Sequence, residues 1–363
     1  MVGFSVMFPE QFIFALMMSK IIKTLDKKIF IVMGGAQITK NINHLIERGE
    51  FSDFVDGYVI NDGESPLAEL VYQIEHSKNL DQVPNFYFKN GGSYSKSNND
   101  FSCDTKCLIS PNFDGFFFFH LPLRLSIGCP WGKCTFCTYR LFHKKYSSGK
   151  IETVIKIIKS LQKKYSISNF SFIDDFLPPN FLKRLSEALL REKIKILWSC
   201  SIGLVPGFDG EIVKSMAKSG CRSIRTGLES MSSRVLKLMD KPHNPKLAKT
   251  ILALFRDSGI QVNINVIFGF PTETKEEASI TLDFLLMNKG DLFDSVVIQQ
   301  FSLEKDTLIF NEPQNFGITK IYGEEKFFDI RLGYEYEIDS GMTQEEGRLF
   351  TEKAKRLVGG NFR

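Results

Sequence analysis

The sequence lacks a long apolar run, a surplus of one charge and any repeated or low-complexity segment. A membrane-spanning helix needs about 20 uninterrupted apolar residues, and Pro9, Glu10 and Gln11 interrupt the N-terminal candidate. That segment has neither a basic start nor a small-residue cleavage pattern, so a signal peptide is not expected. The net charge of +4 is too small to indicate nucleic-acid binding, because lysines are interleaved with acids. We expect a cytoplasmic protein with no membrane or nucleic-acid partner.

The composition is that of a globular protein. Apolar residues make up 43% and charged residues 24% of the 363 residues, a length typical of about two domains. The 34 phenylalanines indicate a drift towards large apolar residues and not a site. In a reducing compartment, clustered cysteines are more often metal ligands or catalytic groups than disulfides. The distribution of the seven cysteines therefore matters more than their number.

Alternating strands and helices predict a first α/β region over residues 1–100. Three strands are expected, and Asn90–Asp100, rich in Gly, Ser and Asn, is expected to be a loop at a domain boundary. Ser65 is expected to cap a helix over Pro66–His76. The expected strands are Val2–Met7, Phe30–Met33 and Tyr58–Ile60, and the other helices are Pro9–Leu25 and Lys40–Glu50.

After a linker at residues 101–120, residues 121–305 predict six β/α units. The helices expected between the strands are long enough to be the crossovers that parallel strands need. The sheet is therefore expected to be parallel, and either open or partly closed into a barrel. Residues 306–363 are expected to be an extension that ends in a helix over Thr343–Val358. The expected strands are Leu123–Ile127, Phe170–Ile173, Leu197–Ile202, Cys221–Thr226, Val262–Phe268 and Ser295–Phe301.

Cys129, Cys134 and Cys137 form a C-x4-C-x2-C group directly after the first of these six strands. Active sites of parallel α/β folds gather at the carboxyl ends of the strands. Three thiolates on one loop fit three corners of an iron–sulfur cluster. Structural zinc, with Cys103 and Cys107 as further ligands, and unligated thiols are the alternatives. Cys200 and Cys221 lie in expected strands and fit a core.

With Phe136 just before its last cysteine, this loop resembles the signature of the radical S-adenosylmethionine (radical SAM) superfamily. That signature opens a (β/α)6 partial barrel, usually with C-x3-C-x2-C spacing, and the longer loop here resembles a variant among cobalamin-type members. The resemblance implies that Cys129, Cys134 and Cys137 hold a [4Fe–4S] cluster whose open iron binds S-adenosylmethionine (SAM).

Later strand ends resemble the family's SAM-binding segments. They are Asp174-Asp175 after the second strand, Gly227-Leu228-Glu229-Ser230 after the fourth and Gly269-Phe270-Pro271-Thr272-Glu273-Thr274 after the fifth. The resemblance implies SAM contacts from Phe136, Asp174, Asp175, Glu229, Gly269 and Phe270, although no Gly-Gly-Glu motif is present. The alternatives are helix capping by the aspartates, capping by Ser230 and a plain strand-to-helix turn.

Two N-terminal segments resemble the second half of the B12-binding domain of cobalamin-type members: Gly-Gly-Ala-Gln-Ile at residues 34–38, and residues 56–64. The resemblance implies a partial Rossmann-like α/β domain whose opening strands are missing. An Asp-x-His-x-x-Gly motif is also absent, so cobalamin binding is left open. A shortened sheet would expose an unpaired edge, which favours association.

The resemblance implies reductive cleavage of SAM to a 5′-deoxyadenosyl radical, with an electron donor such as flavodoxin or ferredoxin. C-methylation or another modification of a peptide or small-molecule natural product is the implied reaction. Trp131, Phe136 and Phe270 would keep such a site dry, or they pack in the core. The alternatives are a noncatalytic iron–sulfur or zinc-binding remnant or partner subunit, and a radical SAM enzyme that does not use cobalamin.

Overall fold

The computed structural model describes residues 1–49, 51–76, 79–100, 110–138, 145–323 and 333–359. The chain divides into two units, an N-terminal unit through Asp104 and a C-terminal unit from Thr105. This division falls inside the predicted linker at residues 101–120. Cys103 and Cys107 lie outside the described residues. The two units are taken separately below.

The N-terminal unit contains a five-stranded sheet with its strands in chain order. The first three strands are parallel, and the last two pair antiparallel. Helices α1 and α2 pack on one face through Phe12, Ile38 and Tyr58, and α3 packs on the other through Leu70. The elements are β1 Val2–Ser5, α1 Pro9–Leu25, β2 Ile31–Gly34, α2 Ala36–Arg48, β3 Gly57–Val59, α3 Glu64–Glu75, the 3₁₀ helix η1 Leu80–Gln82, β4 Phe86–Asn90 and β5 Ser93–Lys96.

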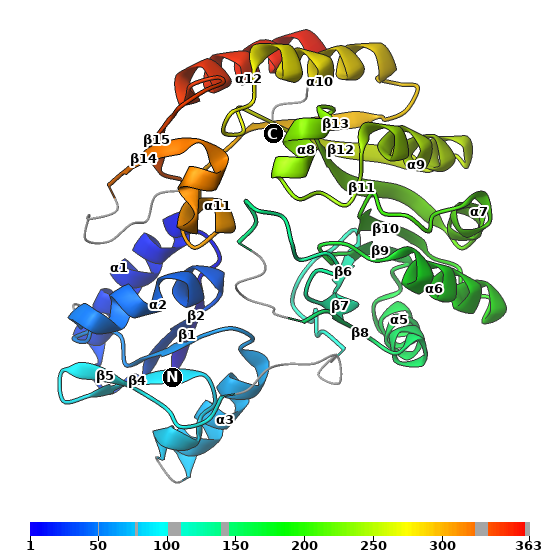
Figure 1. Ribbon diagram of the computed structural model, residues 1–363. Coiled ribbons are helices and arrows are strands. Elements are labelled where there is room, and N and C mark those ends of the chain that lie inside the picture. The colour runs from blue at the N-terminus through cyan, green and yellow to red at the C-terminus, as the bar shows by residue number, and fades with distance from the viewer. Residues whose placement is uncertain (50, 77–78, 101–109, 139–144, 324–332, 360–363) are drawn as a thin grey trace. The chain divides into compact units, whose positions relative to one another are not determined.

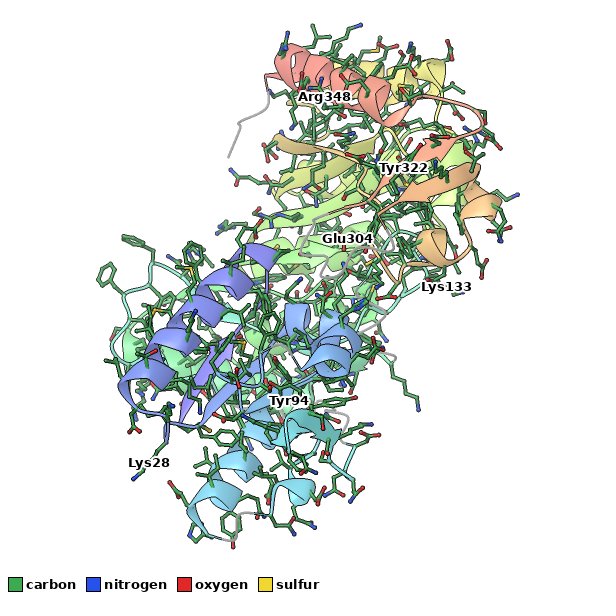
Figure 2. The ribbon with its side chains drawn as sticks, turned by 90° about the vertical axis from the view of Figure 1, so that its left-hand side faces the viewer. Lys28, Tyr94, Lys133, Glu304, Tyr322 and Arg348 are labelled. Atoms are coloured by element: carbon green, nitrogen blue, oxygen red, sulfur yellow. The ribbon has the colours of Figure 1, made fainter. Side chains whose placement is uncertain are left out.

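Three predictions for this unit were wrong. Three strands were expected, but the sheet has five, because β4 and β5 extend it. Residues 90–100 were expected to be a loop, but β5 begins at Ser93 and pairs with β4. Gly91 and Gly92 turn the chain with φ of 59° and 95°, a conformation that glycine adopts without strain. Tyr94, which is labelled in Figure 2, anchors β5 by donating to the Val55 carbonyl at 2.9 Å. Helix α3 begins at Glu64 after Gly63, so Ser65 lies inside the helix and does not cap it.

The C-terminal unit contains six parallel strands in the order β6-β9-β10-β11-β12-β13. This singly wound order confirms the predicted six β/α units, and Figure 1 shows α5, α6, α7 and α9 along one side of the sheet. The strands are β6 Leu121–Leu123, β9 Asn169–Phe172, β10 Leu197–Ile202, β11 Cys221–Glu229, β12 Gln261–Phe268 and β13 Ser295–Gln300. The helices are α5 Ile151–Tyr165, α6 Pro179–Arg191, α7 Gly210–Lys218, α8 Ser233–Leu238, α9 Pro245–Asp257 and α10 Lys275–Asn288.

The two faces of this sheet differ in chemistry because its strands alternate. On β12, Val262, Ile264 and Val266 are fully buried and join the core formed with the helices. Asn263 and Asn265, between them, point to the opposite face and are partly exposed. The helices therefore cover one face of the sheet, and the other face is polar and accessible.

The expected strand Leu123–Ile127 is interrupted. Its first part is β6, whereas Ser126–Ile127 form β7, which pairs antiparallel with β8 Ser147–Ser148. The chain leaves the parallel sheet because a buried carboxylate, Asp174, accepts hydrogen bonds from the backbone between β6 and β7. The β7–β8 pair brings together the two ends of the segment that contains the three clustered cysteines.

The C-terminal segment adds an antiparallel pair and a long helix. Helix α12 contacts the sheet through Phe350, whose ring centroid lies 5.2 Å from that of Phe268. No helix in the described part of the chain combines the length and apolarity of a membrane span. The elements are α11 Leu308–Asn311, the 3₁₀ helix η3 Pro313–Phe316, β14 Ile318–Tyr322, β15 Glu335–Ile338 and α12 Gln344–Val358.

Candidate functional site

The cysteine loop follows β7, and Cys129, Cys134 and Cys137 form no disulfide and are half-buried. Gly128 has φ of 82°, and a Cβ there would lie 2.6 Å from the Lys145 carbonyl oxygen, so only glycine allows this approach. Within the loop, the Gly132 amide donates to Cys129 Sγ at 3.4 Å. The backbone therefore presents the first thiol from a tight and locally determined turn.

The carboxyl end of α8 holds the loop in place. Thr135 donates its amide to the Met239 carbonyl at 3.1 Å and its hydroxyl to the Leu238 carbonyl at 2.9 Å. Trp131 Nε1 donates to the Asp240 carbonyl at 2.6 Å. These carbonyls have no partner inside the helix, so they are available to bind another segment. Trp131, expected to keep the site dry, serves here as an anchor.

Beside the loop lies a buried ion pair that the sequence analysis only half identified. Lys241 Nζ lies 3.1 Å from Glu229 Oε1, and the two side chains are 12% and 10% exposed. Gly227 makes room for this pair, because a Cβ there would lie 2.1 Å from Glu229 Oε1 and 3.1 Å from Lys241 Nζ. Glu229 was predicted and Lys241 was missed. No sequence signal marked Lys241, because it lies 12 residues after Glu229 and is one of many lysines.

Electrostatics link the ion pair to the thiols. Burial raises the pKa of Cys134 to about 11, and the Lys241 charge opposes this rise. Burial alone would lower the pKa of Lys241, but Glu229 and Cys134 outweigh it and the net direction is upward. Lys241 therefore stays charged, and its positive charge lies where thiolates would need compensation.

Asp174 and Asp175 occupy different environments. Asp174 is 5% exposed and accepts hydrogen bonds from the amides of Leu125 and Ser126 and from the Ser126 hydroxyl at 2.6 Å. Burial raises its pKa, and these bonds act against the rise. The alternative that it caps the following helix was wrong, because Pro178 is the cap residue of α6. Asp175 is exposed just after the carboxyl end of β9.

The turn after β12 carries Gly269 and Phe270. Gly269 has φ of 74°, and a Cβ there would lie 3.0 Å from the Gly347 Cα. Phe270 is fully buried, with ring centroids 5.0 Å from Phe301 and 6.3 Å from Phe136. Phe270 thus packs in a core, which was the alternative role given for it. Phe136 is partly buried and connects that core to the cysteine loop.

The same turn contains a buried carboxyl group, Glu273, which belongs to the segment predicted to bind SAM but was given no role of its own. Its Oε2 accepts the Gly269 amide at 2.7 Å, and its Oε1 has no partner among the described atoms. Burial raises the pKa of Glu273 to about 8, despite hydrogen bonds from the Gly269 and Phe270 backbone. Glu273 is therefore largely neutral near pH 7 and fixes the shape of the turn.

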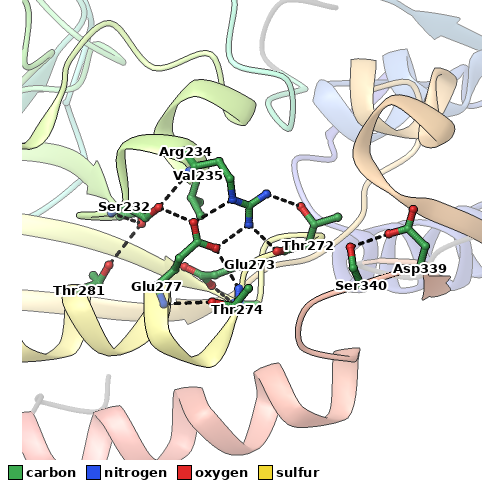
Figure 3. Close-up of polar contacts among 12 residues, drawn as sticks. Ser232, Arg234, Val235, Thr272, Glu273, Thr274, Glu277, Thr281, Asp339 and Ser340 are labelled. Atoms are coloured by element: carbon green, nitrogen blue, oxygen red, sulfur yellow. Dashed lines mark hydrogen bonds and ion pairs between the residues drawn. The ribbon is translucent and has the colours of Figure 1, made fainter.

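A polar network joins α8, α10 and this turn (Figure 3). Arg234 Nη2 donates to Glu277 Oε2 and to the Thr272 carbonyl, both at 2.5 Å. The Ser232 hydroxyl, which caps α8, donates to Glu277 Oε1 at 2.9 Å. Arg234 holds the pKa of Glu277 at about 2. Ser230, proposed as a cap in the alternative interpretation, accepts from the Ser232 amide instead.

The donor set suits a multi-iron cluster, which takes separate thiolates at separate corners. The three half-buried cysteines lie on one clamped loop, with a buried cation beside them.

Comparison with known proteins identifies the central part of the chain. Residues 123–285 match the family model of the radical SAM superfamily. The chain is 28% identical over 284 residues to an uncharacterized methyltransferase of Pyrococcus horikoshii, covering 73% of this chain and 60% of that protein. It is 26% identical over 175 residues to bacteriochlorophyllide d C-12(1)-methyltransferase of Chlorobaculum tepidum, covering 47% and 38%.

A solved structure shares the fold. It is the radical SAM methyltransferase TsrM of Kitasatospora setae, with cobalamin and a [4Fe–4S] cluster bound. The TM-score is 0.73 at 16% identity, over 90% of this chain and 70% of that one. The similarity extends beyond the residues that match the family model. The chain spans about 60% of the length of its Pyrococcus relative.

Proposed function

Since residues 123–285 are a radical SAM domain, we propose that the chain is a radical SAM enzyme in which Cys129, Cys134 and Cys137 hold a [4Fe–4S] cluster. The observation that carries this proposal is the position of three half-buried cysteines on one loop, fixed to the end of α8 beside a buried Lys241. When bound, the cluster supplies an electron for reductive cleavage of SAM to a 5′-deoxyadenosyl radical, and the protein supplies orientation and electrostatics.

Different residues of the chain would balance charge, contact SAM and support these contacts. Lys241 would balance the negative charge of the thiolates in a site of low dielectric. Direct SAM contacts are proposed for Phe136, Asp175, Glu229 and Gly269, because all four lie on the cysteine loop or at carboxyl ends of strands. Asp174 and Phe270 are proposed to act indirectly. The first holds the turn before the cysteine loop, and the second supports Phe136.

Methyl transfer to a carbon atom of a peptide or small-molecule substrate is the proposed reaction, with an electron donor such as flavodoxin or ferredoxin. Support comes from relatives named as methyltransferases. Cobalamin is proposed as the methyl carrier on the N-terminal unit, whose sheet has helices on both faces. A radical SAM enzyme without cobalamin is the second candidate, because the chain carries no Asp-x-His-x-x-Gly segment.

The test is anaerobic reconstitution with iron and sulfide, followed by SAM and dithionite. We expect a brown chromophore and formation of 5′-deoxyadenosine. Cys134→Ala should abolish both, because two thiolates cannot hold three corners of the cluster. Cys200→Ala is the matched control: it removes a thiol from the core of the same unit and should keep the chromophore. Bound zinc with tetrahedral coordination, together with no formation of 5′-deoxyadenosine, would overturn the proposal.

Cobalamin use is measured separately. Hydroxocobalamin is added to the full chain, and its visible spectrum is recorded after the free corrin has been removed. Retention of one equivalent would support the cobalamin-dependent form. A protein that forms 5′-deoxyadenosine but retains no corrin would be the second candidate.

A further inference from the structure

The face of the six-stranded sheet that the helices leave open carries polar side chains in register. They come from four neighbouring strands. Arg225 is exposed and the others are partly exposed, whereas Cys200, Ile224 and Ile264, which alternate with them, are at most 4% exposed. The set comprises Ser171 of β9, Ser199 and Ser201 of β10, Ser223 and Arg225 of β11, and Asn263 and Asn265 of β12. An apolar core does not require these residues, so the face is available for a ligand.

Some of these groups satisfy one another. The hydroxyls of Ser171 and Ser199 lie 3.2 Å apart, and Asn263 Nδ2 donates to Ser223 Oγ at 2.7 Å. These four residues belong to adjacent strands, so their bonds run across the sheet. They form a layer of two separate hydrogen-bonded pairs with little need of a ligand.

Arg225 stands out from that layer. It pairs in register with Ser201 on one side and Asn263 on the other, and its side chain is exposed. Within the described part of the chain, the Arg225 guanidinium has no carboxylate partner, unlike the charged pair at Glu229 and Lys241. An arginine in the middle of a central strand is thus left with its donors unused.

The position of Arg225 relates it to the proposed reaction site. Gly227 is the next residue of β11 on the same face, about 7 Å further along the strand. The Glu229 carboxylate folds over Gly227, and Lys241 lies beside the cysteine loop. A ligand held at Arg225 and extended along β11 would therefore reach towards the thiols.

We infer that Arg225 binds the carboxylate of an amphipathic substrate, with Ser201 and Asn265 as further hydrogen-bond donors. This inference rests on the proposed function, because it takes the bound molecule to be the substrate of that reaction. A planar guanidinium pairs with a carboxylate through two parallel hydrogen bonds. One unpaired positive charge matches one carboxylate better than a doubly charged phosphate. Ile173 and Val297 are 60% and 49% exposed at either side, which suits an apolar body.

The first test is arginine modification by phenylglyoxal on the reconstituted full chain, read by peptide mass spectrometry. Hexanoate is the probe, with neutral hexanamide and inorganic phosphate as comparisons. Two charge-assisted hydrogen bonds give a dissociation constant of order millimolar, so about 10 mM hexanoate should slow the labelling of Arg225 about threefold or more. Arg222, exposed on the same strand, is the internal control and should be labelled at an unchanged rate.

Three outcomes would overturn the inference: no protection by hexanoate, protection by phosphate but not by hexanoate, or protection by SAM alone. The second test measures hexanoate binding by saturation-transfer NMR. Arg225→Gln should abolish the signal, Arg225→Lys should retain part of it, and Arg222→Gln should retain all of it. Neither readout requires turnover. Absence of 5′-deoxyadenosine would therefore contradict the proposed function, whereas the binding of a carboxylate by Arg225 is tested separately.

Discussion

The two sheets of this protein differ in what covers them. The N-terminal sheet has α1 and α2 on one face and α3 on the other. The C-terminal sheet has its core on one face, while the opposite face carries partly exposed Ser, Asn and Arg side chains. A sheet covered on both faces can offer a ligand only the ends of its strands, whereas a half-covered sheet also offers a face. The C-terminal unit can therefore bind a ligand along its strands as well as at their ends.

The strongest test of this comparison removes the buried cation beside the open face. Lys241→Met should lower the free energy of unfolding by about 3–5 kcal/mol, because it leaves the Glu229 carboxylate buried and unpaired. Urea denaturation measures the loss. The double variant Lys241→Met/Glu229→Gln should recover much of it, since no lone charge remains. A double variant no more stable than the single variant would contradict the ion-pair explanation.

A second prediction compares the cores of the two units. Leu70→Ala in α3 and Leu185→Ala in α6 each empty a fully buried position and should each cost about 3 kcal/mol. Hydrogen exchange should show the loss of protection in the strands of the altered unit: β2–β4 for Leu70→Ala and β9–β10 for Leu185→Ala. Equal loss of protection in both sheets from either variant would show that the chain unfolds as one cooperative body.

The smallest expected effect is the pH dependence that Glu273 gives to the C-terminal unit. The pKa of Glu273 is about 8 in the folded chain against an ordinary 4.5, so the folded state holds the proton more tightly. Its contribution to stability is complete below pH 4.5 and declines as pH rises to about 8, by at most about 1.4 kcal/mol per pH unit. Urea titrations between pH 5 and 8 measure this slope.

Glu273→Gln is the matched variant for that slope, because glutamine keeps the shape of the side chain and does not titrate. Its stability should vary less with pH over the same interval. An unchanged slope in the variant would assign the pH dependence to another group.

Much of the fold was predictable because strand and helix periods are local. The bounds of α1 and β10 agree with the prediction, and the six β/α units followed from strand spacing and helix length. The hairpin of β4 and β5 was missed because β5 is short and polar, and pairing rather than burial forms it. The break between β6 and β7 was missed because Asp174, 49 residues from Leu125, causes it.

The candidate site was also predictable from the sequence only in part. The cysteine loop could be identified because its three thiols lie within nine residues. Lys241, 12 residues after Glu229, could not be identified as its partner, since one of many lysines carries no signal of burial. Arg225 gave no signal for the same reason. An exposed arginine on an open sheet face and a solvated surface arginine look alike in sequence.

By itself, the sequence determined the alternating strands and helices, the parallel C-terminal sheet and the cysteine loop at a strand end. Each depends on residues that are neighbours along the chain, through period, capping or spacing. Only the tertiary structure decided that Lys241 faces Glu229, that Trp131 holds the end of α8, and that Arg225 has no partner among the described residues. The physical reason is that burial and pairing depend on contacts between distant segments, which no local pattern records.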